Sequence, residues 1–290
     1  MSIALRTGAG CALLLATAWL AWPQTPTSAA PSPDTPTAPT SPPKEPAAPD
    51  SEKPSFSAEI GGSYGALNHG AAPWKELSVK LGYTGSKRFT PFLTLSSQDR
   101  GSGSQQSYGA YSYVTLSKRV WAIVGASGAP ARSGILYPML RTGGSLFVGV
   151  LPSVPGLFLS AGYSDIRMPG GSGGEIASVG AIYYGRVILS GGVNFNRSRP
   201  GGLNSQSAQA GFQFGRQGRY WFGGGASGGD AAYQLIGAVP FNVHFNGVGG
   251  NVFYQRWLTR RFGLICRYDY VDEIDFFKKH GVYLASFFEF

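Results

Sequence analysis

The three histidines are the residues of this chain best suited to acid–base or metal chemistry. They are His69, His244 and His280. A hydrolase needs a nucleophile, a histidine base beside it and an acid that orients the base. Imidazole nitrogens are also common ligands of zinc. All three histidines lie at or beside segments that read as long surface loops, so any site that they form would lie among these loops.

Carboxylates close to His280 in the sequence would complete such a site. In a closed sheet the first strand pairs with the last, which would bring His69 near His280. With a nearby acid, the two would form a metal site or an acid–base pair; the acids available are Asp272, Glu273 and Asp275. The alternative, which we favour, is three exposed loop histidines that share no role. We therefore assign no catalytic residue and no metal site.

A second group consists of charged side chains within strand-like segments. Their positions predict that they face the interior of a closed sheet; they are Glu59, Glu76, Lys80, Arg141, Asp165, Arg267, Asp269 and Glu289. Such charges either line a water-filled path and set its selectivity or pair with one another across a plugged interior. We favour pairing, because Arg267 and Glu289 lie on neighbouring expected strands.

The glycine runs do not predict a cofactor site. The pairs Gly170–Gly171 and Gly173–Gly174 and the run Gly223–Gly225 open no helix, and no phosphate-loop lysine follows them. Within strands, glycines permit close packing and bending. We expect no cofactor.

The segments that carry the charged residues alternate in polarity with a period of two. In WKELSVKLGY (74–83), Leu77, Val79 and Leu81 share one face, whereas Glu76 and Lys80 share the other. A barrel in a membrane would turn the apolar face towards lipid. A soluble sandwich would show the same alternation with the apolar face inward, so alternation alone does not decide between them.

Three further features favour a transmembrane β-barrel of the bacterial outer membrane. The sequence ends GVYLASFFEF, similar to the last strand that the barrel-assembly machinery recognises, so we assign Phe288 and Phe290 as an assembly signal. Short connections alternate with longer ones. Aromatic residues gather at segment ends, where their rings would lie at headgroup level. These aromatic residues are Trp74, Tyr83, Phe89, Trp121, Tyr137, Tyr163, Tyr183, Tyr184, Tyr220, Trp221, Trp257 and Tyr268.

Six short and seven long connections predict an all-β, antiparallel barrel of fourteen strands. The expected strands are 56–67, 74–84, 89–99, 107–117, 120–129, 137–151, 157–168, 175–184, 187–197, 205–215, 220–228, 244–258, 262–270 and 281–290. Twelve strands is the alternative, because the glycine-rich stretch 218–250 is hard to divide. Backbone groups in hydrocarbon must be paired, so the sheet must close on itself.

The composition agrees with a sheet that meets lipid. The chain has 290 residues, of which 43 are glycine and only 13% are charged; soluble domains average about 25% charged residues. The mean hydropathy is −0.05. The formal net charge of +9 arises mostly from short basic pairs between the expected strands. This pattern predicts solvated turns at a membrane surface, with some attraction to anionic headgroups, and no nucleic-acid partner.

The N-terminal segment predicts export. Residues 1–29 read as a signal peptide, with Arg6 before an apolar run from Ala9 to Trp22; cleavage after Ala29 is favoured over cleavage after Ala18. Residues 30–55 are rich in proline and predict a disordered periplasmic linker. Residues 56–290 form the expected barrel. Cys11 lies in the signal peptide, which leaves Cys266 without a partner for a disulfide.

Several stretches resemble the YaiO-type outer-membrane β-barrel family. They are WKELSVKLGY (74–83), ILYPMLRTGGSLF (135–147), LFLSAGYSDIRM (157–168), ASVGAIYYGRVILSGGVNF (177–195) and RWLTRRFGLICRYDYVDE (256–273). The resemblance implies an outer-membrane barrel with no established chemistry. Some related barrels lie beside, or are fused to, machinery for surface polysaccharide. No tetratricopeptide repeats precede this barrel, unlike in a full polysaccharide-export porin.

From these observations we expect a non-enzymatic barrel that is a narrow channel or a partner of a surface-polysaccharide system. The alternatives are an outer-membrane hydrolase that uses the loop histidines, and a surface receptor or adhesin. The expected partners are outer-membrane lipids, lipopolysaccharide, the barrel-assembly machinery and polysaccharide-export components.

Overall fold

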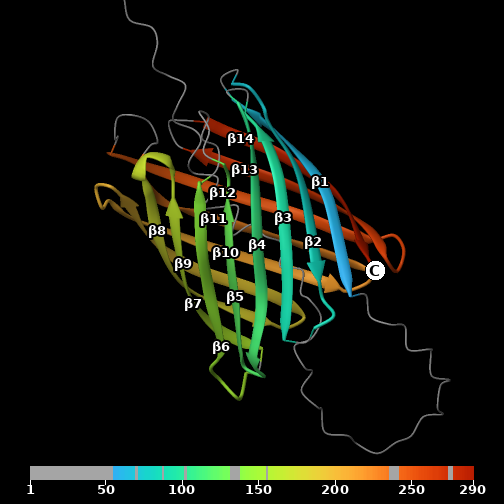
Figure 1. Ribbon diagram of the computed structural model, residues 1–290. Coiled ribbons are helices and arrows are strands. Elements are labelled where there is room, and N and C mark those ends of the chain that lie inside the picture. The colour runs from blue at the N-terminus through green and yellow to red at the C-terminus, as the bar shows by residue number, and fades with distance from the viewer. Residues whose placement is uncertain are drawn as a thin grey trace, which may run out of the picture.

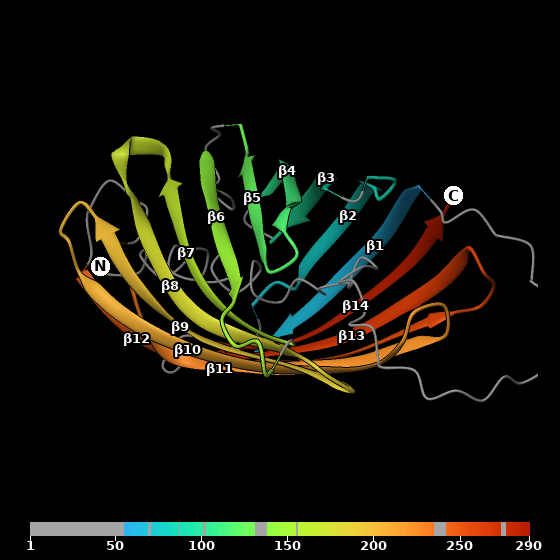
Figure 2. The ribbon, with the colours of Figure 1, turned by 90° about the horizontal axis from the view of Figure 1, so that it is seen from below.

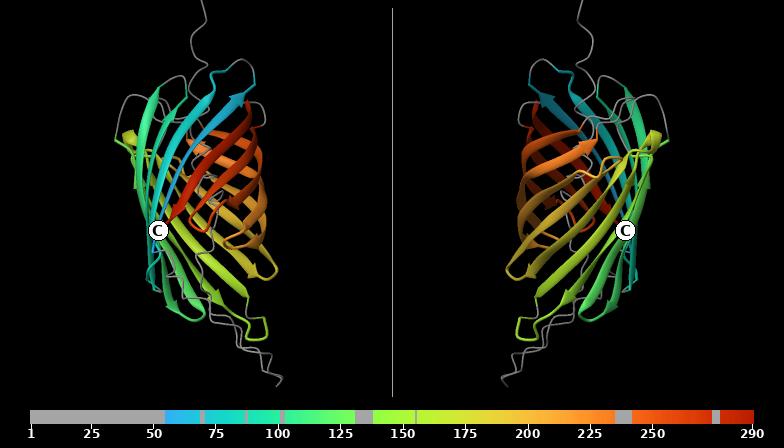
Figure 3. Two further views of the ribbon diagram at one scale, coloured as in Figure 1. Left: turned by 90° about the vertical axis from the view of Figure 1, so that its right-hand side faces the viewer. Right: turned by 90° about the vertical axis from the view of Figure 1, so that its left-hand side faces the viewer.

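The fold is a closed antiparallel β-barrel in which every strand pairs with its two neighbours. The computed structural model describes residues 55–68, 71–86, 88–100, 103–130, 138–154, 156–234, 242–273 and 277–290. Figure 1 and Figure 3 show the strands inclined across the barrel wall. The predicted signal peptide and all of the predicted linker except Ser55 lie outside the described residues.

Fourteen strands lie in the described residues. They are β1 (Phe56–Leu67), β2 (Trp74–Tyr83), β3 (Phe89–Asp99), β4 (Ser104–Ser117), β5 (Val120–Gly128), β6 (Leu140–Gly149), β7 (Leu157–Arg167), β8 (Gly173–Tyr184), β9 (Val187–Arg199), β10 (Asn204–Arg216), β11 (Tyr220–Gln234), β12 (Asn242–Trp257), β13 (Phe262–Glu273) and β14 (Phe277–Glu289). A short 3-10 turn, η2 (Pro169–Gly171), precedes β8. None of the described segments is a helix long and apolar enough to cross a membrane.

The predicted fold class and strand number are confirmed, and the twelve-strand alternative is wrong. At the short turns, the predicted strand ends agree closely with the structure. At the side of the long connections, several strands are longer than predicted. β11 continues to Gln234 where 228 was expected, and β14 begins at Phe277 where 281 was expected. Short turns mark the periplasmic side of outer-membrane barrels, so the strands extend beyond the expected band on the outer side.

Side chains alternate between lipid and interior along each strand. On β2, Leu77 and Leu81 are 60% and 46% exposed, whereas Trp74 is 8% exposed. On β14, Val282, Leu284 and Phe288 are exposed, whereas Phe277, Ala285 and Phe287 are buried. An exposed apolar face and a partly polar interior distinguish a membrane barrel from a soluble sandwich.

Pairing of β1 with β14 closes the barrel. The register joins Ser57 to Glu289 and Leu67 to Lys279. Beyond the last paired residues, the amide of Phe290 donates to the carbonyl of Phe56 at 2.8 Å. Figure 2 shows β1 and β14 side by side, with β10–β12 forming one long side of the barrel and β3–β6 lying opposite.

Candidate functional site: the lumen and its two walls

The barrel encloses a cavity of about 540 Å³, and residues from all fourteen strands line it. This space is far larger than the volume that a single water needs. Its lining differs strongly around the circumference. One wall is neutral and built from small residues, and the other is charged and aromatic.

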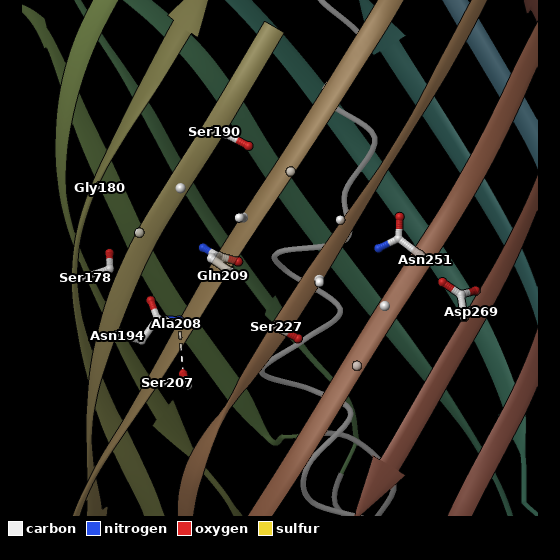
Figure 4. Close-up of a pocket in the computed structure, with 18 of the residues that line it drawn as sticks. Ser178, Gly180, Ser190, Asn194, Ser207, Ala208, Gln209, Ser227, Asn251 and Asp269 are labelled. Carbon is white, nitrogen blue, oxygen red and sulfur yellow. Dashed lines mark hydrogen bonds between the residues drawn. The ribbon is translucent and has the colours of Figure 1, made fainter.

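The neutral wall is formed by β8–β12. Hydroxyl and amide side chains point into the cavity from successive strands; they are Ser178, Ser190, Asn194, Ser207, Gln209, Ser227 and Asn251 (Figure 4). Asn194 Nδ2 donates to Ser207 Oγ at 3.4 Å. Among the described residues of these strands, none that lines the cavity is charged. The wall therefore offers hydrogen-bond donors and acceptors without a fixed charge.

Glycines lie between these polar residues and keep the neutral wall thin. Gly180, Gly192 and Gly225 line the cavity from β8, β9 and β11. A Cβ on Gly180 would lie 2.6 Å from the carbonyl oxygen of Gly191 on the neighbouring strand. A larger residue there would force the strands apart, so close strand packing requires this glycine.

The charged wall is formed by β1–β3, β13 and β14. Lys80 Nζ lies 2.5 Å from Glu59 Oε2, and the Tyr283 hydroxyl donates to Glu59 Oε1 at 2.8 Å. Arg267 Nε lies 3.0 Å from Asp269, and its guanidinium lies 4.9 Å from the centre of the Tyr283 ring. Most of these charges are thus matched within the wall itself.

In the outer part of this wall, two cationic side chains contact the indole ring of Trp74. Arg100 stacks over the Trp74 ring at 4.2 Å, and Lys279 Nζ lies 5.4 Å from the same ring. Arg100 Nε donates to Gln98 Oε1 at 2.8 Å. Contact with an aromatic face stabilises a desolvated cation. Neither Arg100 nor Lys279 was predicted, because both lie in segments that were expected to be loops.

The structure places the predicted lumen charges at three kinds of position. Glu76, Arg141, Arg267 and Asp269 line the cavity. Glu59 and Lys80 form the buried pair described above. Glu289 faces inward near the short turns.

The expected pairing of Glu289 with Arg267 is wrong. Trp257 Nε1 donates to Glu289 Oε2 at 3.2 Å and Gln217 Nε2 to Oε1 at 3.3 Å. Arg267 is opposite Tyr283, six residues before Glu289 on β14. The separation along the strand is therefore too large for the pair to form, and Asp269 takes the place of Glu289 beside Arg267.

The prediction that Asp165 faces the lumen is also wrong. Asp165 shares its face of β7 with Leu159 and Tyr163, which are 47% and 52% exposed. It pairs with Arg167 at 2.8 Å and with Arg199 on the outside of the barrel. Side chains alternate along β7 without a break, so Asp165 must share the outer face of Leu159 and Tyr163 although it is charged.

An aromatic collar lies inside the barrel near the short turns. We use this name for seven contacting residues of β3–β8: Phe92, Tyr111, Tyr113, Trp121, Phe147, Phe158 and Tyr184. Phe92 stacks on Tyr111 at 4.8 Å between ring centres, and Trp121 stacks on Phe147 at 3.7 Å. A second buried cluster on β11–β14 contains Trp221, Trp257 and Phe287. These rings pack the periplasmic part of the interior.

The collar corrects the prediction for the aromatic segment ends. Tyr83, Phe89, Tyr163, Tyr183 and Tyr268 are exposed on the lipid side, as expected. Trp74, Trp221 and Trp257 are buried, and Trp121 and Tyr184 pack inside with Phe147 and Phe158. Tyr220 is on the outer face of β11 and contacts Tyr254. Tyr137 lies outside the described residues. The alternation of side chains could have predicted which of these aromatic residues face inward, because adjacent residues such as Tyr220 and Trp221 must face opposite sides of the sheet.

Of the three histidines, only His280 has a side chain among the described residues, so the site predicted from the loop histidines stays a prediction. His69 lies outside the described residues, as does the side chain of His244, whose backbone pairs with Ala232. His280 is exposed on β14, and its Nδ1 lies 2.6 Å from the Tyr268 hydroxyl. Glu273 is buried and Asp272 bonds to Lys278 at 3.0 Å; Asp275 lies outside the described residues. The described residues contain no cluster of three or more potential metal ligands.

The residues assigned as an assembly signal lie on the outer face at the closing seam. Phe288 and Phe290 are 36% and 59% exposed. The Phe288 ring lies 4.9 Å from that of Phe262 and 6.4 Å from that of Phe290. Their role in assembly stays a prediction. Cys266 is a free, exposed cysteine on β13.

Comparison with known proteins gives a family and a fold. The model of the YaiO membrane β-barrel domain matches residues 55–234. No curated protein matches the sequence. The CymD monoaromatic hydrocarbon channel is similar over 82% of this chain and 89% of that one, with 8% identity and a TM-score of 0.51. At such identity the likeness shows the fold alone.

Two further solved structures have lower scores. The outer membrane protein Omp33 of Acinetobacter baumannii is similar over 82% of this chain and 99% of its own, with 12% identity and a TM-score of 0.48. A bacterial polysaccharide outer membrane secretin is similar over 81% of this chain and 98% of its own, with 9% identity and a TM-score of 0.47.

Proposed function

This chain belongs to the YaiO membrane β-barrel family, whose members are outer-membrane barrels, and from that premise we propose that it is a narrow channel for small polar solutes. The observation that carries the proposal is the polar cavity inside the barrel. The polar interior of an outer-membrane barrel is either a water-filled channel or plugged, and the cavity that residues of all fourteen strands line favours a channel. The aromatic collar narrows the passage on the periplasmic side and restricts the size of the solute.

The two walls define the solute that the channel favours. Ser190, Ser207 and Ser227 offer hydroxyls, and Asn194 and Asn251 offer amides, so they replace hydration of a polar molecule without binding it tightly. The opposite wall holds charges that are largely paired. We therefore propose weak selectivity between cations and anions and stronger selectivity by size.

The proposal includes no hydrolytic step. His280 faces outward and contacts Tyr268, whereas Glu273 is buried. Because the two lie on opposite faces of the wall, they do not supply a joined acid–base pair. A partner in a surface-polysaccharide system and a role as surface receptor stay predictions from the sequence.

Cysteine scanning in planar bilayers tests the channel. In a chain with Cys11→Ala and Cys266→Ala, the single cysteine of Ser227→Cys faces the cavity, and a charged, water-soluble thiol reagent should lower its single-channel conductance by at least about half. The matched control is Ala226→Cys, because Ala226 precedes Ser227 on β11 and is exposed on the lipid side. The same reagent should leave its conductance unchanged. Absence of any single-channel current in the parent protein would overturn the proposal.

A further inference from the structure

The periplasmic rim of the barrel carries a large and one-sided charge. Nine basic residues lie in or beside the short turns and are exposed: Arg88, Lys118, Arg119, Arg186, Arg216, Arg219, Arg256, Arg260 and Arg261. None of the nine forms an ion pair within the described ranges. At the opposite end, basic residues are paired on the outer surface, as Arg199 is with Asp165 and Lys278 with Asp272.

Five of these residues form one dense group on two adjacent turns. We call it the arginine patch: Arg216, Arg219, Arg256, Arg260 and Arg261. The Trp257 amide donates to the Arg219 carbonyl at 3.0 Å, which joins the β10–β11 turn to the end of β12. The Glu289 amide donates to the Arg261 carbonyl at 2.8 Å, yet the Glu289 carboxylate faces inward and accepts from Trp257 and Gln217. The patch therefore has no neutralising group of its own in the part of the chain that the structure describes.

Two members of the patch face the bilayer and not the periplasm. The register aligns Arg216 with Tyr220, and Tyr220 with Arg256. Arg256 shares the outer face of β12 with Val252 and Tyr254, which are 47% and 42% exposed. Tyr220 contacts Tyr254 at 6.3 Å between ring centres. Tyrosines at a barrel surface lie at headgroup level, so this arrangement holds two guanidinium groups on either side of an aromatic ring at that level.

We propose that the arginine patch is a binding site for the phosphate headgroups of anionic phospholipids in the periplasmic leaflet. Guanidinium groups bind phosphate oxygens through paired hydrogen bonds. The aromatic ring between Arg216 and Arg256 packs against the glycerol and upper acyl region. A soluble acidic protein would approach from the periplasm and reach Arg219, Arg260 and Arg261, but it would not reach the two side chains on the lipid face. The position of these two favours a lipid.

Lipid binding to the purified full chain in detergent tests this site. Cardiolipin, which has two phosphates, and zwitterionic phosphatidylethanolamine serve as probes, and bound lipid is counted by native mass spectrometry. We expect Arg216→Gln/Arg256→Gln to weaken cardiolipin binding about tenfold or more, since each basic residue near an anionic surface contributes roughly fivefold and the variant removes two. The matched control, Arg88→Gln/Arg186→Gln, removes the same charge from another part of the rim and should retain the binding of the parent.

Each outcome of this experiment either supports or overturns the lipid site. Loss of cardiolipin binding in the patch variant alone supports the site. Equal binding by parent and patch variant overturns it, as does equal loss in both variants, which would indicate diffuse attraction by the rim. Binding of phosphatidylethanolamine as tight as that of cardiolipin overturns it too. Displacement of cardiolipin by a peptide of residues 30–55, which contains four acids and two lysines, would identify the patch as a peptide-docking surface instead. Identical heat-dependent gel mobility of all proteins confirms folding.

Discussion

Replacement of Lys80 by methionine should destabilise the barrel strongly, because it leaves a buried carboxylate without its cation. Lys80 Nζ and Glu59 Oε2 are 2.5 Å apart, and the two side chains are only 15% and 13% exposed. Breaking a buried ion pair by removing one partner costs about 3–5 kcal/mol. Tyr283 still donates to Glu59 in the variant, so we expect the lower value, about 3 kcal/mol.

The neutral double variant separates the ion pair from simple loss of packing. Glu59→Gln/Lys80→Met keeps the side-chain sizes and an acceptor for Tyr283 but removes both charges, and replacing a whole buried pair is often nearly neutral. We expect it to recover at least about 2 kcal/mol relative to Lys80→Met alone. The control is Lys75→Met, since Lys75 is exposed on the outer face of the same strand.

Urea unfolding in lipid vesicles, followed by tryptophan fluorescence, measures these differences. The shift in the midpoint multiplied by the slope gives the change in the free energy of unfolding, provided that the slope is unchanged. Two results would refute the reasoning: Lys80→Met within about 1 kcal/mol of the parent, which is the cost of an exposed pair, or a double variant as unstable as the single one.

Three further predictions follow from the collar, the lipid face and the outer surface. Trp121→Ala should lower the free energy of unfolding by about 3–5 kcal/mol and raise single-channel conductance, because the Trp121 ring stacks on Phe147 at 3.7 Å; unchanged conductance would show that the collar does not limit flow. In vesicles, Cys266 should react with a membrane-permeant maleimide and resist a charged one, since it is exposed beside Leu264 on the lipid face. Mass spectrometry of the labelled protein measures the extent of each reaction, and faster labelling by the charged maleimide would contradict this position for Cys266. Arg199→Ala should cost no more than about 1 kcal/mol in the same urea assay, because its 40% exposed side chain forms a solvent-screened pair with Asp165; a larger loss would indicate a buried network.

Alternation predicted the strands because lipid enforces it. Leu77, Leu81 and Leu284 must face hydrocarbon. Because side chains alternate along a strand, these three positions assign the face of all remaining residues on β2 and β14. The same rule could have placed Asp165, which has the parity of Tyr163. Its charge suggested an inward position, although β7 extends past the bilayer to a level where an outward carboxylate is solvated and paired.

Other features of the lumen could not be read from the sequence because they depend on strand length. Arg100 and Lys279 lie in polar segments that predict loops, yet Asp99 is the last residue of β3 and β14 already begins at Phe277. Once strands extend beyond the bilayer, these residues reach the lumen mouth and meet at Trp74. The collar likewise needs the register of β3–β8, which brings together rings that are far apart in the sequence.

The pairing of β1 with β14 has a consequence for the order in which the barrel forms. Every other pair joins strands that follow one another, so it closes a short loop, whereas Ser57 meets Glu289 across nearly the whole chain. Since each doubling of loop length adds about 0.6 kcal/mol to the entropy of closure, this seam costs about 2–3 kcal/mol more than a hairpin. Non-local pairing is also slow. We therefore expect β1 and β14 to join last, so that until then the growing sheet has two unpaired edges which lipid cannot satisfy and another protein must shield.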